Sequence, residues 1–206
     1  MTLNSRRLGG SYAFRESLEM NVIKCVEVSA PLDFLRPMLT TWADRVELVS
    51  QSFPQAHHSY YLEPTLVGLL SGSAWTHGMP SITEVKIQRT LQGSPNRAGR
   101  LDLLMHHGKM RIALEAKLIW DSELIPGNVL NALSTACAEV ISISGNRADI
   151  LLGGVFFVPW WDNEAQRQNL KSRVLDPYEH LQLDIKICCY DPAIDFPGAM
   201  FMAQIA

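Results

Sequence analysis

The chain has 206 residues, of which 47% are hydrophobic and 19% are charged, and its formal net charge at pH 7 is −3. This composition is typical of a folded domain and excludes collagen-like and disordered chains. A chain of this length forms one core more naturally than two, so we expect a single domain over residues 29–206, preceded by an arm or strand at residues 1–28. The slight acidic excess gives no global basic surface for nucleic acid, so phosphate binding would need a local patch or metal ions.

The first half of the chain predicts two helices followed by three strands. Apolar residues recur at helical spacing from Leu32 to Val49, and Pro64 suits the first position of a second helix, which places Glu63 at the mouth of that helix. From Ser81 the spacing changes to every second residue. The three strands, separated by turn-rich residues, are predicted at residues 82–90, 99–106 and 109–120.

The second half predicts alternating helices and strands. They are a helix, a buried strand, a polar helix and a last strand, at residues 128–144, 150–158, 163–174 and 181–190. The nearly continuous apolar run at 150–158 is typical of a strand covered on both faces in a parallel arrangement. Pro192 and Pro197 break the pattern that follows. This order predicts an α/β fold with a mixed central sheet flanked by helices.

No segment has the length and uninterrupted apolar character of a membrane span. The longest apolar run, near residues 150–161, is broken by Gly153 and Pro159. The N-terminus carries two arginines but lacks the apolar core of a signal peptide. We therefore expect a cytoplasmic protein without a membrane partner.

Acids and a lysine alternate with apolar residues on the second and third predicted strands. If His107-Gly108 form a two-residue loop, or a four-residue loop surrounds them, Asp102 lies opposite Ala113 and diagonal to Glu115, on the same face. Lys117 shares that face, because side chains alternate along a strand. A three-residue loop would send the two acids to opposite faces. The register of this hairpin therefore decides whether the three groups converge.

The stretch GRLDLL at residues 99–104, followed after a short turn by ALEAK at residues 113–117, resembles the PD-(D/E)XK nuclease superfamily, which has the restriction-endonuclease-like fold. In that family an aspartate lies on one strand and an acid-x-lysine triplet on the next, within an α-β-β-β-α-β core. The likeness covers residues 60–160, or about half the chain. It implies a nuclease that hydrolyses the phosphodiester bonds of DNA with Mg²⁺ or Mn²⁺, and a homodimer would let it cut two strands.

The resemblance also implies roles for individual residues. Carboxylate oxygens are natural ligands of Mg²⁺ and Mn²⁺, so Asp102 and Glu115, together with the backbone carbonyl of Ala116, would hold the metal. Lys117 would stabilise developing charge or orient the attacking water. Glu63 matches the position from which the family recruits a further acid.

Two other acid-x-lysine triplets are present. Glu84-Val85-Lys86 lies on the first predicted strand, and Asp184-Ile185-Lys186 follows a predicted helix. Neither has an upstream acid on a hairpin partner, so the triplet at Glu115 is preferred. The sequence leaves open whether Glu84 rather than Glu63 joins the metal site.

Other interpretations of the same residues stay open. The acids and the lysine could form a solvated strand face with cross-strand ion pairs. The chain could also be a catalytically inactive member of the fold that serves as a binding or assembly module, in keeping with its negative charge and with Leu101 standing where the family has proline. In a third interpretation, the triplet is a coincidence in an unrelated α/β protein.

Overall fold

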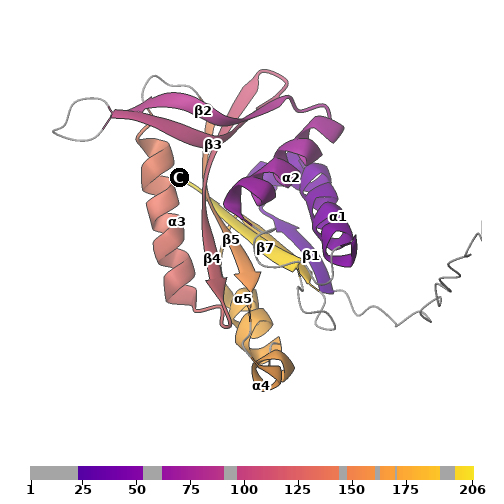
Figure 1. Ribbon diagram of the computed structural model, residues 1–206. Coiled ribbons are helices and arrows are strands. Elements are labelled where there is room, and N and C mark those ends of the chain that lie inside the picture. Colours follow the sequence, from indigo (N-terminus) through magenta and orange to yellow (C-terminus); the bar gives the residue numbers. More distant parts are fainter. Residues whose placement is uncertain are drawn as a thin grey trace, which may run out of the picture.

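The computed structural model describes residues 23–52, 62–90, 97–143, 148–160, 163–169, 171–190 and 198–206. Within these ranges the chain forms a mixed seven-stranded sheet with helices on both faces (Figure 1). The predicted α/β class, with a mixed central sheet flanked by helices, is therefore confirmed.

The strands follow one another in space in an order that differs from the sequence. They are β1 (Ile23–Val28), β2 (Ser81–Arg89), β3 (Arg97–His107), β4 (Met110–Asp121), β5 (Ile150–Pro159), β6 (Ile185–Tyr190) and β7 (Gly198–Ile205). Their order in the sheet is β1-β6-β7-β5-β4-β3-β2. Among the described strands, β4 and β5 pair in parallel and the other neighbours pair antiparallel. The predicted three-strand meander and the parallel strand after it are both present.

Helices of the first half cover one face of the sheet, and those of the second half cover the other. The first group is η1 (Ala30–Leu35), α1 (Arg36–Ser52) and α2 (Glu63–Thr76). The second group is α3 (Pro126–Ile141), the π-helical turn η3 (Lys171–Leu175) and α5 (Asp176–His180), and the short helix α4 (Glu164–Gln168) precedes η3. The helix α3 connects the parallel strands β4 and β5, because a parallel pair cannot be joined by a tight turn.

The main core lies between α1, α2 and the centre of the sheet. Trp42 of α1 stacks near Phe156 of β5, with ring centroids 5.9 Å apart, and the ring of Phe201 of β7 lies 4.9 Å from that of Phe156. The indole N–H of Trp42 donates to the carbonyl oxygen of Leu66 at 3.2 Å, so this buried polar group is satisfied. The three rings tie one helix to the two central strands.

The second helix begins one residue earlier than predicted. Glu63 is its first residue and Pro64 its second. Proline is tolerated there because the first N–H groups of a helix have no partner within the helix. Glu63 therefore belongs to the helix N-terminus, at the edge where the sheet and α2 meet.

The C-terminal part differs more from the prediction. The polar helix expected at residues 163–174 is divided into α4 and η3. A further helix that was not expected, α5, begins at Asp176-Pro177, and the strand expected from residue 181 begins at Ile185. The strand β7 was missed. It begins directly after Pro197, at Gly198 with φ of 120°, and it lies between β5 and β6. The two prolines that predicted the end of regular structure instead precede a central strand.

Residues 23–28, predicted as part of an N-terminal arm or strand, form β1 and pair with β6 at one edge of the sheet. The remainder of that segment, residues 1–22, lies outside the described residues.

Candidate functional site

The candidate acids lie where β3 and β4 stop pairing. Their ladder runs from His107 opposite Met110 to Leu103 opposite Leu114, and the turn is Gly108-Lys109, with Gly108 at φ of 61°. The predicted loop at His107-Gly108 was wrong by one residue, because His107 extends the strand and the glycine takes the left-handed position. Leu104, not Asp102, therefore faces Ala113. Continued by one residue, the same register sets Asp102 across from Glu115.

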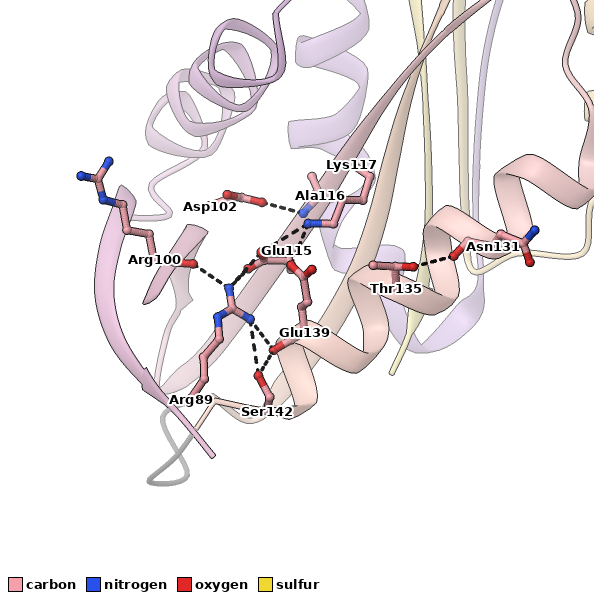
Figure 2. Close-up of polar contacts among 10 residues, drawn as sticks. All are labelled: Arg89, Arg100, Asp102, Glu115, Ala116, Lys117, Asn131, Thr135, Glu139 and Ser142. Carbon is pink, nitrogen blue, oxygen red and sulfur yellow. Dashed lines mark hydrogen bonds and ion pairs between the residues drawn. The ribbon is translucent and has the colours of Figure 1, made fainter. Parts of the chain in front are cut away.

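Beyond this last pair the two strands separate, and side chains fill the space between them. The backbone N–H of Ala116 donates to Oδ2 of Asp102 at 2.7 Å, so the aspartate takes a bond that a strand carbonyl would otherwise accept. Asp102 is thereby held against the triplet that contains Glu115 and Lys117. Figure 2 shows Asp102 beside β4 at Ala116, while Lys117 reaches Glu139 of α3.

Glu115 is the most deeply buried acid of the group. Its side chain is 5% exposed, and both of its carboxylate oxygens accept from Nη2 of Arg89 at 2.9 Å. Arg89 is the last residue of β2 and was not a predicted site residue. A cation from the edge strand thus already engages the acid that the sequence assigned to a metal.

Lys117 is held between two acids. Its Nζ lies 2.7 Å from Oε2 of Glu139 and 3.7 Å from Oε1 of Glu115 (Figure 2). Glu139 comes from α3 and was also missed. The sequence pattern could have indicated it, because Glu139 is next to Val140 and three residues after Ala136. Val140 and Ala136 are both buried on the face that α3 turns toward the sheet.

The surroundings shift the pKa values of these carboxyl groups. Burial raises the pKa of Glu115 to about 8, and its hydrogen bond with Glu139 and the charge on Asp102 act in the same direction, whereas Arg89 opposes them. Burial also raises the pKa of Asp102, against the opposing hydrogen bond from Ala116. The protein therefore keeps Glu115 and Asp102 together where both resist ionisation, a pattern that clusters at functional sites.

The pKa of Lys117 is raised as well, but for a lysine this rise favours the charged form. Burial by itself would lower the pKa of its ammonium group, but the hydrogen bond and charge of Glu139 outweigh burial and raise that pKa. The lysine therefore remains a cation at neutral pH.

Glu63 and Glu84 approach the group from two further elements. Burial raises the pKa of Glu63, and the negative charge of nearby Asp102 adds to the rise. Glu84 of β2 has a left-handed φ of 54°, which interrupts the pairing of β2 with β3, and its carboxylate pairs with the exposed Arg100 at 3.0 Å. Glu63 is half-buried and Glu84 is exposed, so Glu63 is the better placed of the two alternatives to share an enclosed site.

The oxygen donors of Asp102, Glu115 and Glu63 suit a hard cation such as Mg²⁺. Their present arrangement does not yet form a cage: within the described ranges, no group of three His, Cys, Asp or Glu side chains is set to hold a metal ion. Arg89 takes both oxygens of Glu115, and Ala116 takes one oxygen of Asp102. The donor chemistry fits a divalent ion, and Glu115 would have to exchange its partner to reach one.

Comparison of the chain with protein-family models, with curated proteins and with solved structures finds no match. The assignment of this site therefore depends on its own geometry.

The Asp184-Ile185-Lys186 triplet has different surroundings. The carboxylate of Asp184 accepts from Ser29 and from the backbone N–H of Ile205, both at 2.9 Å, and Lys186 pairs with Glu27 at 2.7 Å. These contacts tie β1, β6 and β7 together, so this triplet has a structural role.

None of the helices described is both long enough and apolar enough to cross a membrane.

Proposed function

We propose that the protein is a metal-dependent nuclease of the PD-(D/E)XK type, which hydrolyses phosphodiester bonds of DNA with Mg²⁺ or Mn²⁺. The observation that carries the proposal is the 2.7 Å hydrogen bond from Ala116 to Asp102, because it fixes the aspartate against the Glu115-Ala116-Lys117 triplet. The order of elements supports it: α2 precedes the meander β2-β3-β4, and α3 leads to β5, which is parallel to β4. This order agrees with the α-β-β-β-α-β core of a restriction-endonuclease-like fold.

Each residue of the group has a defined chemical task in this proposal. Asp102 and Glu115 would hold the metal, with the carbonyl of Ala116 and the carboxylate of Glu63 as further oxygen donors. When bound, the ion supplies charge neutralisation and lowers the pKa of an attacking water. The ammonium of Lys117, oriented by Glu139, offers a fixed positive charge to a phosphate oxygen.

A groove next to the acids could admit a nucleic acid strand. It has a volume of about 650 Å³ and runs between the start of β3 and α3. Its polar lining comes from Arg89, Arg97, Ser134, Thr135, Glu139 and Ser142. Guanidinium and hydroxyl groups are donors that phosphate oxygens accept, and Arg89 and Glu139 connect the groove to the acidic group. A cytoplasmic location and a homodimer that cuts two strands belong to the same proposal.

A cleavage assay with Mg²⁺ or Mn²⁺ tests this function. Asp102→Ala and Lys117→Ala should each lower the rate by about 100-fold or more, since the first removes a metal ligand and the second removes the fixed positive charge offered to the phosphate. Lys86→Ala is the matched control, because it changes an exposed lysine of another acid-x-lysine triplet and should leave the rate unchanged. Equal rates for the parent protein and all three variants would refute the assignment.

A catalytically inactive binding or assembly module is the second candidate. It is favoured by the engagement of both Glu115 oxygens by Arg89 and by Leu101 in place of proline. Calorimetry separates the two candidates. An enzyme should bind a divalent cation in a way that Glu115→Gln abolishes, whereas a module of this kind should bind none.

A further inference from the structure

Arg89 is a buried cation whose contacts converge on the acidic group. Its side chain is 15% exposed and leaves the end of β2 to cross toward β4. Besides both oxygens of Glu115, its Nη2 donates to the carbonyl oxygen of Arg100 at 2.7 Å. Its Nη1 donates to the carbonyl oxygen of Glu139 at 2.6 Å and to Oγ of Ser142 at 3.4 Å (Figure 2). The guanidinium is therefore fixed by β3, β4 and α3 together.

The backbone leaves room for this side chain at Gly99. A Cβ atom at that position would lie 2.7 Å from Nε of Arg89, closer than such atoms approach in proteins, and 3.2 Å from its Cδ, which is a tight contact. The φ of Gly99 is not positive, so the backbone conformation itself does not require glycine. Glycine at 99 thus serves the passage of Arg89 across β3.

The charges around Glu115 show why a cation is held there. The acids Glu63, Asp102, Glu115 and Glu139 interact electrostatically with one another, and Lys117 and Arg89 are the cations among them. A buried carboxylate without a partner is costly, and arginine is the cation that can satisfy both oxygens at once. A divalent ion at Glu115 would meet the guanidinium as a like charge.

We propose that Arg89 is a built-in counter-cation that competes with the divalent metal for Glu115 and so sets the affinity of the site for metal. The inference rests on the proposed metal-dependent function and adds to it a positioning residue that acts through Glu115. In the metal-free protein Arg89 holds the carboxylate in place, and metal binding requires Glu115 to exchange the guanidinium for the ion. A purely structural Arg89 would have the opposite effect, because its loss would loosen the acids and weaken binding.

The test is calorimetric titration of the full chain with Mn²⁺ and with Mg²⁺, accompanied by the shift in melting temperature that each ion causes. Arg89→Gln should bind metal about tenfold more tightly or better, since a net contribution of a charged hydrogen bond corresponds to at least that factor. Arg89→Lys keeps the positive charge and should retain an affinity near that of the parent protein. Arg100→Gln, which removes an exposed arginine paired with Glu84, is the matched control and should change affinity by less than about twofold.

A second variant guards against poor folding of Arg89→Gln. Gly99→Ala leaves every charge in place but displaces the Arg89 side chain, so it should also tighten metal binding, to a smaller extent. Tighter binding in Arg89→Gln, or in Gly99→Ala if the first variant does not fold, supports the proposal.

The outcomes separate this inference from the proposed function. If the parent protein binds metal and the folded variants bind it equally or more weakly, the role of Arg89 is overturned and the nuclease proposal survives. If only the variants bind, Arg89 blocks the site in the parent protein, which supports the inference and favours the inactive module. If no folded variant binds metal, both proposals are overturned.

Discussion

The pairing of Arg89 with Glu115 allows a quantitative test by a double-mutant cycle, without any metal. The perturbations are Arg89→Gln, Glu115→Gln and their combination, compared at pH 9 because burial raises the pKa of Glu115 to about 8. Removing one partner of a fully buried pair costs about 3–5 kcal/mol, and the side chains here are 15% and 5% exposed. Since glutamine can keep one hydrogen bond, we expect Arg89→Gln, which leaves the ionised Glu115 without its cation, to cost about 3 kcal/mol.

The double variant should cost less than the sum of the single changes. Two charge-assisted bonds of 2.9 Å end on one guanidinium nitrogen, and hydrogen bonds to charged groups contribute about 1.5–3 kcal/mol, so a coupling free energy of about 2 kcal/mol is expected. Denaturation by urea, followed by circular dichroism, measures the free energies of unfolding. In a chain of this length each kcal/mol corresponds to about 2–4 °C in Tm.

The exposed pair of Arg100 and Glu84 provides the control cycle. These side chains are 70% and 50% exposed, so their coupling should stay below about 1 kcal/mol. A coupling of the same small size for Arg89 and Glu115 would refute the reasoning that their ion pair is a buried and specific contact.

Two further predictions concern pH and the core. In the folded protein Glu115 keeps its proton up to a pH of about 8, whereas its ordinary pKa is 4.5. The stability that this raised pKa contributes is therefore complete below pH 4.5 and is lost as the pH rises toward 8. The Tm of the parent protein should therefore fall more over this range than the Tm of Glu115→Gln, and parallel Tm profiles would contradict the raised pKa. Phe201→Ala should lower the free energy of unfolding by about 3–5 kcal/mol, because the ring is 1% exposed and packs against both Trp42 and Phe156. A loss below about 1 kcal/mol in a urea titration would show that these rings are not tightly packed.

Local patterns predicted most of the elements. The alternation after Ser81 found the meander, and the continuous apolar run at 150–158 found β5, a strand buried on both faces and parallel to β4. The pattern failed at β7. Two of the seven residues before this strand are prolines, and the strand begins directly after the second of them, Pro197. A proline cannot donate a hydrogen bond to a strand ladder, but it does not prevent the next residue from beginning a strand.

The candidate site was likewise predicted in part from local sequence patterns. The order GRLDLL, turn, ALEAK placed Asp102, Glu115 and Lys117 on neighbouring strands, because strand alternation and a short turn are local properties. The turn lies one residue later than predicted, so the pairing shifts by two residues: Asp102 lies across from Glu115 and not Ala113, and both acids stay on one face.

The amino-acid sequence by itself determined the α/β class, the meander and the acids that it brings together. Only the tertiary structure brought in the two remaining partners: Arg89 of the edge strand, which pairs with Glu115, and Glu139 of α3, which pairs with Lys117. Arg89 and Glu139 lie 26 and 24 residues from Glu115 along the chain. Neither separation follows a helical or strand period, so their approach arises from the packing of α3 and β2 against β4 and has no counterpart in local sequence pattern.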